Sequence, residues 1–459
     1  MKNTGLRIVA RDPNKAYVDG MLWLPKARIN TRALQGALEF YVAQGNRPVL
    51  LKLWDETKHH IITPREFLKP QQYVDFPFPF VRLEPVTFPK TGTISKVVLR
   101  DEKQEAASRA MKQARGGILH LAPGKGKTVL ACHRIAELGC PALVIVHNTY
   151  LMEQWRERIE QFLELPTGEK LGIIQSTEMD WRHPITLAMI HTLALRADEG
   201  ELPSDFMRHF GVVFFDEVHH LAAPLFVKTA PIVQGLRYGL TATPKRTDGL
   251  EFVYNFHIGP VFHEDMEADL VPRVYFQTTP TYIDLSDPTV KDKSGELNTS
   301  RLRAVLGEHK EGNLFRAYCI QEALDQGRKI LALSHSKAQL RALHDIFPDS
   351  GLIIHETPQK ERTGIVKNSK LTLAISRLGV EGLDDAALDS LFFLTPFTAE
   401  NDLQQALGRI LRSHGDKCQP VAVVFEDELI PPLRHMCNKL RRTLNGWGIR
   451  YQSLPVPKS

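Results

Sequence analysis

The sequence predicts an α/β protein with two lobes, each built on a parallel sheet, behind a small α+β N-terminal domain. Short apolar runs without polar alternation recur along the chain, as in strands that are buried on both faces. The runs fall into two series, and segments of helical length separate them, as crossover connections require. The composition is globular, since 43% of the 459 residues are hydrophobic and 24% are charged. This composition excludes a disordered or collagen-like chain.

The first 90 residues are predicted to form the small domain. A helix is expected over residues 31–42, capped by Asn30 or Thr31, with strands near residues 17–23 and 49–54. Residues 75–89 contain four Pro and four Phe, so this segment cannot be helical and is predicted to mark the boundary of the domain.

The charge of this N-terminal region favours an anionic partner. Residues 1–98 carry 15 Lys or Arg against 8 Asp or Glu, whereas the whole chain has a net charge of only +5. Aromatic side chains lie among the basic ones, as in many DNA-binding domains. A solvated basic face and a core of aromatic rings would fit the same residues.

The first lobe is predicted over residues 91–277 and the second over residues 313–459, joined by a polar linker at residues 278–312. Strands of the first lobe are expected at residues 118–121, 143–146, 185–190 and 212–215, with helices at residues 129–138 and 151–162. Strands of the second lobe are expected at residues 330–333, 352–354, 371–375, 391–394 and 421–425. Residues 433–459 carry six basic residues and no acidic residue, which indicates either a phosphate-binding surface or a solvated final helix.

The compartment is predicted from what the sequence lacks. The five cysteines never occur at C-x-x-C spacing, which fits a reducing compartment. No apolar segment resembles the core of a signal peptide or reaches the ~18 residues of a membrane helix. We therefore expect a cytoplasmic protein without a membrane partner.

A candidate phosphate-binding loop occupies residues 121–128, Leu-Ala-Pro-Gly-Lys-Gly-Lys-Thr, between an apolar run and a predicted helix. Glycines let backbone N–H groups surround a phosphate, and the helix N-terminus adds positive potential. The Lys127 ammonium would contact the β- and γ-phosphates of ATP, and the Thr128 hydroxyl would ligate Mg²⁺. The predicted nucleotide contacts in this loop are Pro123, Gly124, Lys125, Gly126, Lys127 and Thr128.

Two acidic residues, Asp216 and Glu217, directly follow the apolar run at residues 212–215. At the carboxyl end of a parallel strand, Asp216 would hold Mg²⁺ through water and Glu217 would polarise the attacking water. An acidic loop without catalytic function would look the same. We expect His219 to take a polar coupling role, because no third metal ligand stands at a suitable spacing.

Arg409 and Arg412 stand three residues apart and therefore share one face of a predicted helix. Two guanidinium groups on one face can bind the charge that develops on a transferring phosphoryl group. An exposed basic helix would show the same spacing.

In order and spacing, these segments and several others resemble the motifs of superfamily 2 helicases over most of residues 99–425. The matching segments are LRDEKQ (99–104), VIVHN (144–148) with Gln154 and Trp155, DEVH (216–219), LTATP (240–244), HETPQKER (355–362), EGLD (381–384) and QALGRILR (405–412). Thr241-Ala242-Thr243 and Gln405 resemble the XPB-like and phage UvsW-like DNA branch more than RNA helicases. One departure is that the threonine of the fifth motif falls at Ile375, with Ser376 adjacent.

The resemblance implies two RecA-like lobes that bind ATP and Mg²⁺ between them, and it assigns roles to further residues. It implies nucleotide contacts at Arg100, Gln104, Gly382 and Asp384, and catalytic roles for Glu217, Gln405, Arg409 and Arg412. It implies DNA contacts at Asn148, Gln154, Arg246 and Ser376, and coupling roles for His219, Thr241 and Thr243.

The activity that the resemblance implies is ATP-dependent DNA unwinding with 3′–5′ polarity. The compact size resembles phage enzymes that remodel forks, so we expect unwinding or branch migration of forked DNA in replication, recombination or repair. A monomer would suffice for this activity. Two alternatives remain open at this point: a duplex translocase or restriction-type motor that does not separate strands, and a nucleic-acid-stimulated RNA remodeller.

Overall fold

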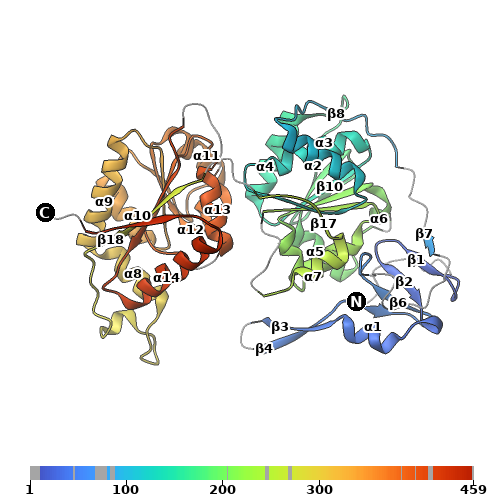
Figure 1. Cartoon of the computed structure of the whole chain (residues 1–459). Coiled ribbons are helices and arrows are strands. Elements are labelled where there is room, and N and C mark those ends of the chain that lie inside the picture. The colour runs from blue at the N-terminus through green and yellow to red at the C-terminus, as the bar shows by residue number, and fades with distance from the viewer. Residues whose placement is uncertain are drawn as a thin grey trace. The chain divides into compact units, whose positions relative to one another are not determined.

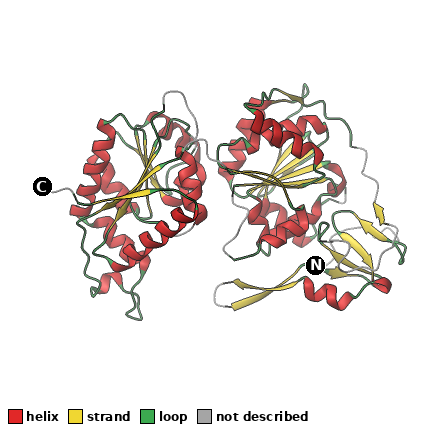
Figure 2. Ribbon diagram, in the orientation of Figure 1, coloured by secondary structure: helices red, strands yellow, loops and turns green. Residues whose placement is uncertain are grey.

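The computed structural model describes residues 11–44, 47–67, 80–82, 88–203, 205–242, 248–266, 271–383, 385–397, 400–411 and 417–456. The chain divides into two compact units, Met1–Met266 and Glu267–Ser459 (Figure 1). Each unit contains a sheet with helices on both faces (Figure 2). The α/β class with two RecA-like lobes is therefore confirmed. Within the described part of the chain, no helix is long and apolar enough to cross a bilayer.

The N-terminal part of the first unit is a small α+β structure. Its five-stranded sheet has the order β5 (Asp55–Glu56), β6 (His60–Thr63), β2 (Leu22–Pro25), β1 (Ala16–Val18), β7 (Phe80–Arg82). The other elements are η1 (Lys26–Arg28), α1 (Thr31–Ala37) and a separate hairpin of β3 (Glu39–Gln44) and β4 (Arg47–Lys52). In Figure 1 this hairpin extends away from the five-stranded sheet.

Two predictions for this region were wrong in detail. The strand expected at residues 17–23 is two antiparallel strands, because the chain turns at Asp19, whose N–H donates to the Met21 carbonyl at 2.9 Å. The helix expected over residues 31–42 ends at Ala37. Phe40, Tyr41 and Val42 prefer strands and pair with β4, so local β-propensity ends the helix early. The Asn30 cap is confirmed, since its Oδ1 accepts from the Ala33 N–H at 3.0 Å.

The first lobe contains an eight-stranded sheet that is parallel except for β13. Its order is β13 (Glu178–Asp180), β12 (Gly172–Gln175), β14 (Ile185–Met189), β10 (Ala142–Val146), β15 (Val212–Asp216), β16 (Leu236–Thr241), β9 (Gly117–Leu121), β17 (Val261–Asp265). One face carries α2 (Glu102–Gln113), α3 (Lys127–Leu138) and α4 (Thr149–Phe162). The other face carries α5 (Ile190–Glu199), α6 (Phe206–His209), η2 (Val218–Ala222), η3 (Phe226–Ile232) and α7 (Glu251–Ile258). A short ribbon pairs β8 (Ile94–Ser95) with β11 (Leu163–Glu164).

The N-terminal structure and the first lobe share one hydrophobic core. A single cluster contains Leu34 and Val42 from the former and Val253 and Tyr254 from the latter. The Arg237 side chain of β16 is fully buried and donates to carbonyls of both parts, including that of Gly20. Residues 11–67 therefore fold onto the lobe and are not joined to it by a linker alone.

The second unit has a seven-stranded, fully parallel sheet. Its order is β20 (Gly351–Ile353), β21 (Leu371–Ile375), β19 (Ile330–Ser334), β22 (Ser390–Phe393), β23 (Val421–Glu426), β18 (Arg273–Thr278), β24 (Tyr451–Leu454). Its helices are η4 (Pro288–Val290), α8 (Thr299–Glu308), α9 (Lys310–Asp325), α10 (Lys337–Ile346), α11 (Gln359–Asn368), α12 (Ser376–Gly382), α13 (Glu400–Ile410) and α14 (Pro431–Gly446).

Two segments lie elsewhere than the sequence suggested. The first lobe was expected to extend to residue 277, but β18 lies between β23 and β24 of the second sheet. An apolar run identifies a strand but not the sheet it joins, because pairing depends on distant partners. The expected linker at residues 278–312 contains α8, which packs with Ile430 and Leu433 in a small core of its own.

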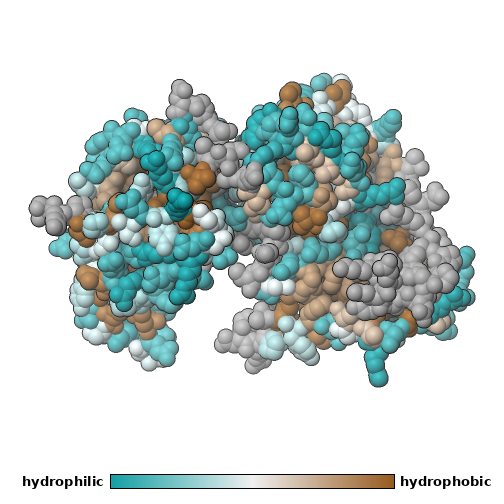
Figure 3. Space-filling view, in the orientation of Figure 1, coloured by the Kyte–Doolittle hydropathy of each residue, from teal (hydrophilic) through white to brown (hydrophobic). Residues whose placement is uncertain are grey.

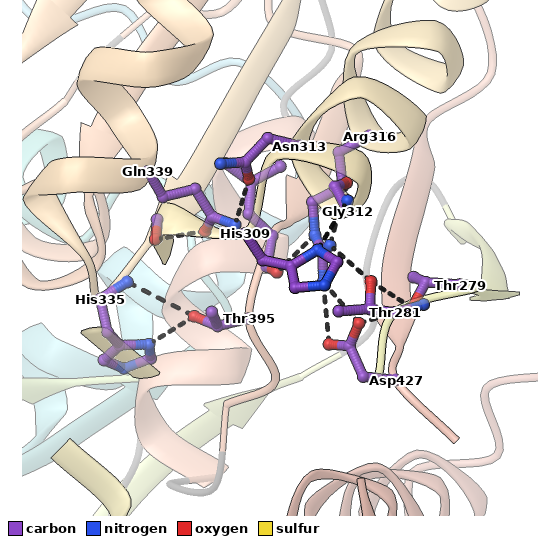
Figure 4. A network of polar contacts seen from close by, with 12 residues as sticks. Thr279, Thr281, His309, Gly312, Asn313, Arg316, His335, Gln339, Thr395 and Asp427 are labelled. Atoms are coloured by element: carbon purple, nitrogen blue, oxygen red, sulfur yellow. Dashed lines mark hydrogen bonds and ion pairs between the residues drawn. The ribbon is translucent and has the colours of Figure 1, made fainter. Parts of the chain in front are cut away.

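A buried polar network stabilises the ends of two strands in the second unit. The Arg316 guanidinium donates to both oxygens of Asp427 at 2.8 Å, and both side chains are fully buried. Asp427 follows β23, and Thr279, which donates to the same carboxylate at 2.5 Å, follows β18 (Figure 4). Since a buried charge is costly unless it is paired, this network fixes the ends of these strands.

Candidate nucleotide-binding site

Three of the predicted segments meet at one edge of the first sheet. β15, β16 and β9 are neighbours and run parallel, with Asp216 opposite Leu240 and Thr241 opposite His120. Their carboxyl ends therefore place the phosphate loop, the two acidic residues and Thr241 side by side. This edge is the usual position of a ligand site in an open α/β sheet.

The phosphate loop turns where its glycines allow a left-handed backbone. Gly124 has φ 82° and Gly126 has φ 88°, and Gly126 caps α3. A Cβ on Gly126 would lie 2.5 Å from the Gln104 Nε2 atom. With no side chain at Gly126, the loop can take this left-handed turn directly before the N-terminus of α3, where unpaired N–H groups favour an anion.

The two lysines of this loop occupy different surroundings. The Lys127 Nζ atom lies 3.1 Å from the Leu121 carbonyl oxygen of its own loop, and the side chain is half-buried. Lys125 is buried, and its Nζ lies 3.6 Å from the Asp265 carboxylate of β17. Lys125 thus attaches the loop to β17, and the phosphate contact of Lys127 stays a prediction.

The Gln104 side chain attaches the segment before α2 to the phosphate loop. Its Oε1 accepts from the Arg100 N–H at 2.9 Å, and its Nε2 donates to the Lys125 carbonyl at 3.2 Å. The Arg100 side chain is exposed and pairs with Asp101 at 2.8 Å. Both polar ends of the Gln104 amide thus contact the protein, and the adenine contact implied for Gln104 stays a prediction.

The Asp216 carboxylate is held in a defined orientation by two donors. The Trp155 Nε1–H donates to Oδ2 at 2.8 Å, and the Glu217 N–H donates to Oδ1 at 3.1 Å. Burial and the neighbouring Glu217 charge raise the pKa of Asp216 above its ordinary value, while the Trp155 hydrogen bond and Lys127 act in the opposite direction. A cation bound here would remove this penalty.

Trp155 is a site residue that the sequence did not identify in this role. It lies on α4 and is buried, 61 residues away from its acceptor in the chain. The Gln154-Trp155 pair was noted only as part of a motif. A buried tryptophan near a strand-end carboxylate was the available signal, because a buried indole N–H usually finds an acceptor.

Glu217 has a backbone conformation that is rare for a side-chain-bearing residue. Its φ is 47°, in the left-handed region. Such strain persists where the surrounding structure enforces it, and it often marks functional sites. Here it directs the carboxylate toward His219, whose Nδ1 lies 3.5 Å from Glu217 Oε2 and 3.4 Å from Thr241 Oγ1. The predicted coupling residues His219 and Thr241 are therefore in contact, whereas Thr243 lies outside the described residues.

The predicted DNA contacts that the structure describes belong to both units of the chain. Asn148 caps α4, with Oδ1 accepting from the Leu151 N–H at 2.8 Å, and its amide nitrogen lies 3.0 Å from His147 Nε2. Gln154 is half-buried, and Arg246 lies outside the described residues. Ser376, at the start of α12, is only 4% exposed and precedes an exposed Arg377, and its DNA contact stays a prediction.

The second unit carries the remaining predicted residues. The Arg409 Nη1–H of α13 donates to the Leu383 carbonyl at 2.7 Å, which joins the sixth motif to the fifth. Gln405 is half-buried on the same helix, and Gly382 is the last residue of α12. Arg412 and Asp384 lie outside the described residues.

The oxygen donors of the first lobe fit Mg²⁺. Thr128 supplies a hydroxyl and Asp216 a carboxylate, and hard oxygen ligands are those that Mg²⁺ prefers. Among the described residues, no three His, Cys, Asp or Glu side chains gather into a metal site. Mg²⁺ would therefore need nucleotide phosphates and water as further ligands, as is usual for this ion.

Comparison with known proteins shows which families and folds this chain is similar to. Residues 96–246 match the family described as type III restriction enzyme, res subunit. The solved structure of S. cerevisiae Dbp5 bound to RNA and ADP BeF3 has a similar fold, with a TM-score of 0.53, 12% identity and coverage of 77% of this chain and 89% of that chain. The sequence relatives are called helicases or translocases, so the comparisons agree with the predicted resemblance to XPB-like helicases.

Three curated relatives make the comparison specific. A putative DNA 3′-5′ helicase Rad25 of Haloarcula marismortui is 28% identical over 74% of this chain and 55% of its own length. A probable helicase D10 of Escherichia phage T5 is 26% identical over 74% and 73%. A putative ATP-dependent RNA helicase L396 of Acanthamoeba polyphaga mimivirus is 27% identical over 73% and 64%. The chain thus spans less than two thirds of the mimiviral and archaeal relatives.

Proposed function

We propose that this protein is an ATP-dependent DNA helicase that opens or remodels forked DNA. The observation that carries the proposal is the meeting of the phosphate loop, the Asp216–Glu217 pair and Thr241 at one sheet edge. Phosphoryl transfer requires mainly positioning and electrostatic stabilisation, which such an edge can supply.

Each residue of the edge has a proposed role. Gly124, Gly126 and Lys127 bind the phosphates, Thr128 and Asp216 hold Mg²⁺, and Glu217 orients the attacking water. Arg409 and Arg412 would contact the transferring phosphate during turnover, and His219 with Thr241 would transmit its state to the nucleic-acid contacts.

DNA is favoured over RNA by the names of several relatives. Those from Haloarcula marismortui and Sulfurisphaera tokodaii are called a DNA 3′-5′ helicase and a DNA 3′-5′ translocase. By this similarity we propose 3′–5′ polarity and a role in replication, recombination or repair. The relative called an RNA helicase supports RNA remodelling as the second candidate.

The N-terminal hairpin supports a nucleic-acid contact in the first unit. Tyr17 and Trp23 are buried in the core, but Tyr41 is 78% exposed, opposite Leu50. The Lys52 ammonium lies 3.4 Å from the ring centre of Trp54 beside this pair. An exposed ring and a nearby cation on this hairpin are suited to contact with a nucleic acid.

The proposed substrate is tested by ATP turnover and strand separation on five nucleic acids. Single-stranded, duplex, forked and four-way-junction DNA and duplex RNA would each be added to the purified protein. We expect the greatest stimulation and unwinding with forked or junction DNA. Stimulation by duplex DNA without unwinding would support the translocase, and stimulation by RNA alone would support the remodeller.

The Lys127→Ala variant tests the ATP site. We expect turnover and unwinding to be abolished with DNA binding largely intact, because the ammonium is proposed to bind the nucleotide phosphates and not DNA. Lys112→Ala is the matched control, since Lys112 is an exposed lysine of α2 whose ammonium lies 3.4 Å from Glu137. Retained ATP turnover in Lys127→Ala would contradict the assignment.

A further inference from the structure

Helix α14 presents two faces of opposite character. Leu433, Cys437, Leu440 and Leu444 are buried against the second sheet. The opposite face is exposed and carries Arg434, His435, Asn438, Lys439 and Arg442. Where α14 faces the viewer in Figure 1, Figure 3 shows mostly hydrophilic side chains.

The cations of this helix differ in whether they are paired. Arg441 lies at the border of the exposed face, and its Nη1 donates to Glu426 Oε1 at 2.6 Å. No ion pair joins Arg434, Lys439 or Arg442 to an acid in the described part of the chain. No acidic residue occurs anywhere in residues 433–459. Arg441 is thus paired with Glu426 of β23, whereas Arg434, Lys439 and Arg442 are exposed to solvent.

We propose that the exposed face of α14 binds the phosphate backbone of duplex DNA. Arg434 and Arg442 are eight residues apart, which is about 12 Å along a helix. One DNA strand carries a phosphate every 3.4 Å of its axis, so this row of cations spans about three to four phosphates. The Glu400 carboxylate, which accepts from Thr443 Oγ1 at 3.2 Å, is an acid beside this face, so three cations face one carboxylate there. This excess of positive charge is complementary to a phosphate backbone. The proposal relies on the proposed function only for the choice of nucleic acid.

The salt dependence of binding tests this surface directly. The nucleotide-free protein would be titrated with a fluorescent 20-bp DNA duplex at several salt concentrations. In an Arg434→Gln/Lys439→Gln/Arg442→Gln variant, we expect the slope of log K against log salt to become shallower by about 2 to 3, since each lost phosphate contact removes about 0.9. We expect ATP turnover without DNA to be unchanged.

Two control variants make the result specific. Arg434→Lys/Arg442→Lys keeps the charges and should keep the slope. Lys367→Gln/Lys370→Gln removes two exposed charges of the same unit, just before β21 and so at the amino edge of the sheet, and should also keep the slope. An unchanged slope in the triple variant, or an equal change in the Lys367/Lys370 control, would overturn the proposal.

The remaining outcomes are also decisive. If the triple variant does not fold, Arg434→Gln and Arg442→Gln singly should each lower the slope by about 0.9, and no change in either would overturn the proposal. If the triple variant lost more affinity for a 20-bp RNA duplex than for the DNA duplex, the choice of DNA would be overturned. A protein that shows the expected change of slope in the α14 variant but hydrolyses no ATP would support this surface and contradict the proposed function.

Discussion

At the scale of single residues, the Asp216 carboxylate shows how the protein prepares a charged ligand. Its strand end is buried, and Glu217 adds a like charge, so the pKa of Asp216 is raised. The Trp155 indole and the Glu217 N–H each donate to one of its oxygens and oppose this shift. The carboxylate is thereby oriented before a cation arrives, at the expense of local stability.

Replacing Trp155 by Phe should weaken Mg²⁺ binding. Phe keeps a smaller aromatic ring at this position, but the donor to Asp216 is lost, and a hydrogen bond to a charged group contributes about 1.5–3 kcal/mol. We expect the Mg²⁺ concentration for half-maximal ATP turnover to rise about tenfold, with nucleotide binding in the absence of Mg²⁺ unchanged.

The control for this change is Trp181→Phe. Trp181 is also buried in the first unit and packs against Phe206 and Phe210. It should change stability but not the Mg²⁺ requirement. An equal Mg²⁺ requirement in wild type and Trp155→Phe would contradict a positioning role for the indole.

At the scale of elements, local sequence determined the turns more reliably than the ends of helices. The phosphate loop was predicted because glycines at residues 124 and 126 permit the left-handed turn that opens α3. The early end of α1 was missed because helix and strand propensities compete over residues 36–42 and tertiary pairing decides between them.

Replacing Gly126 by Ala should abolish nucleotide binding. The new Cβ would lie 2.5 Å from Gln104 Nε2 at a φ of 88°, so both backbone strain and a clash would distort the loop. Gly168→Ala is the matched control, because Gly168 has a similar φ of 85° and nothing within 4 Å of the added Cβ. Both variants should lose about 1–2 kcal/mol of unfolding free energy from the strained backbone. Nucleotide titration should show loss of binding in Gly126→Ala alone; retained binding there would contradict the loop geometry.

At the scale of the whole molecule, the first unit is stabilised by buried contacts between its N-terminal structure and its lobe. A Cβ on Gly20 would lie 2.0 Å from the Pro231 carbonyl oxygen, so the two backbones approach as closely as glycine allows. The Phe40 and Phe252 rings lie 4.1 Å apart, and the Arg65 guanidinium donates to the Gly235 carbonyl at 2.9 Å.

A fragment of residues 91–266 should therefore be much less stable than a fragment of residues 1–266. Without the N-terminal structure, part of the shared core is exposed to water, and Arg237 loses the Gly20 carbonyl as an acceptor. Urea unfolding should show one cooperative transition for residues 1–266 and a lower midpoint or aggregation for residues 91–266. Equal midpoints would show that the two parts are independent domains.

The stability of the protein should fall as the pH is lowered from about 6.5 toward 4. Burial lowers the pKa of His257 to about 3 and that of His335 to about 4. Between these values and the unfolded value of about 6.5, the unfolded chain binds protons that the folded chain does not. The contribution of each neutral histidine to the free energy of unfolding is therefore fully present above pH 6.5. It falls by up to about 1.4 kcal/mol per pH unit as the pH decreases toward the folded pKa.

Urea unfolding at pH 7.5, 6 and 5 would measure this dependence. Asp216 has a raised pKa, so its protonation stabilises the folded state as the pH falls. This single group opposes the effect of two histidines. The His257→Phe variant should show a smaller loss of unfolding free energy between pH 7.5 and pH 5. An identical pH slope in wild type and variant would contradict the buried, neutral state of His257.

The sequence by itself determined the two α/β lobes, the phosphate loop and the acidic pair. These features depend on residues that are adjacent in the chain, and strands buried on both faces read as continuous apolar runs. The tertiary structure alone decided that β18 joins the second sheet, that residues 11–67 share the core of the first lobe, and that Trp155 holds Asp216. It also decided the buried Arg316–Asp427 pair, whose members are 111 residues apart. Such contacts depend on which distant segments meet, and no local pattern of residue types encodes that choice.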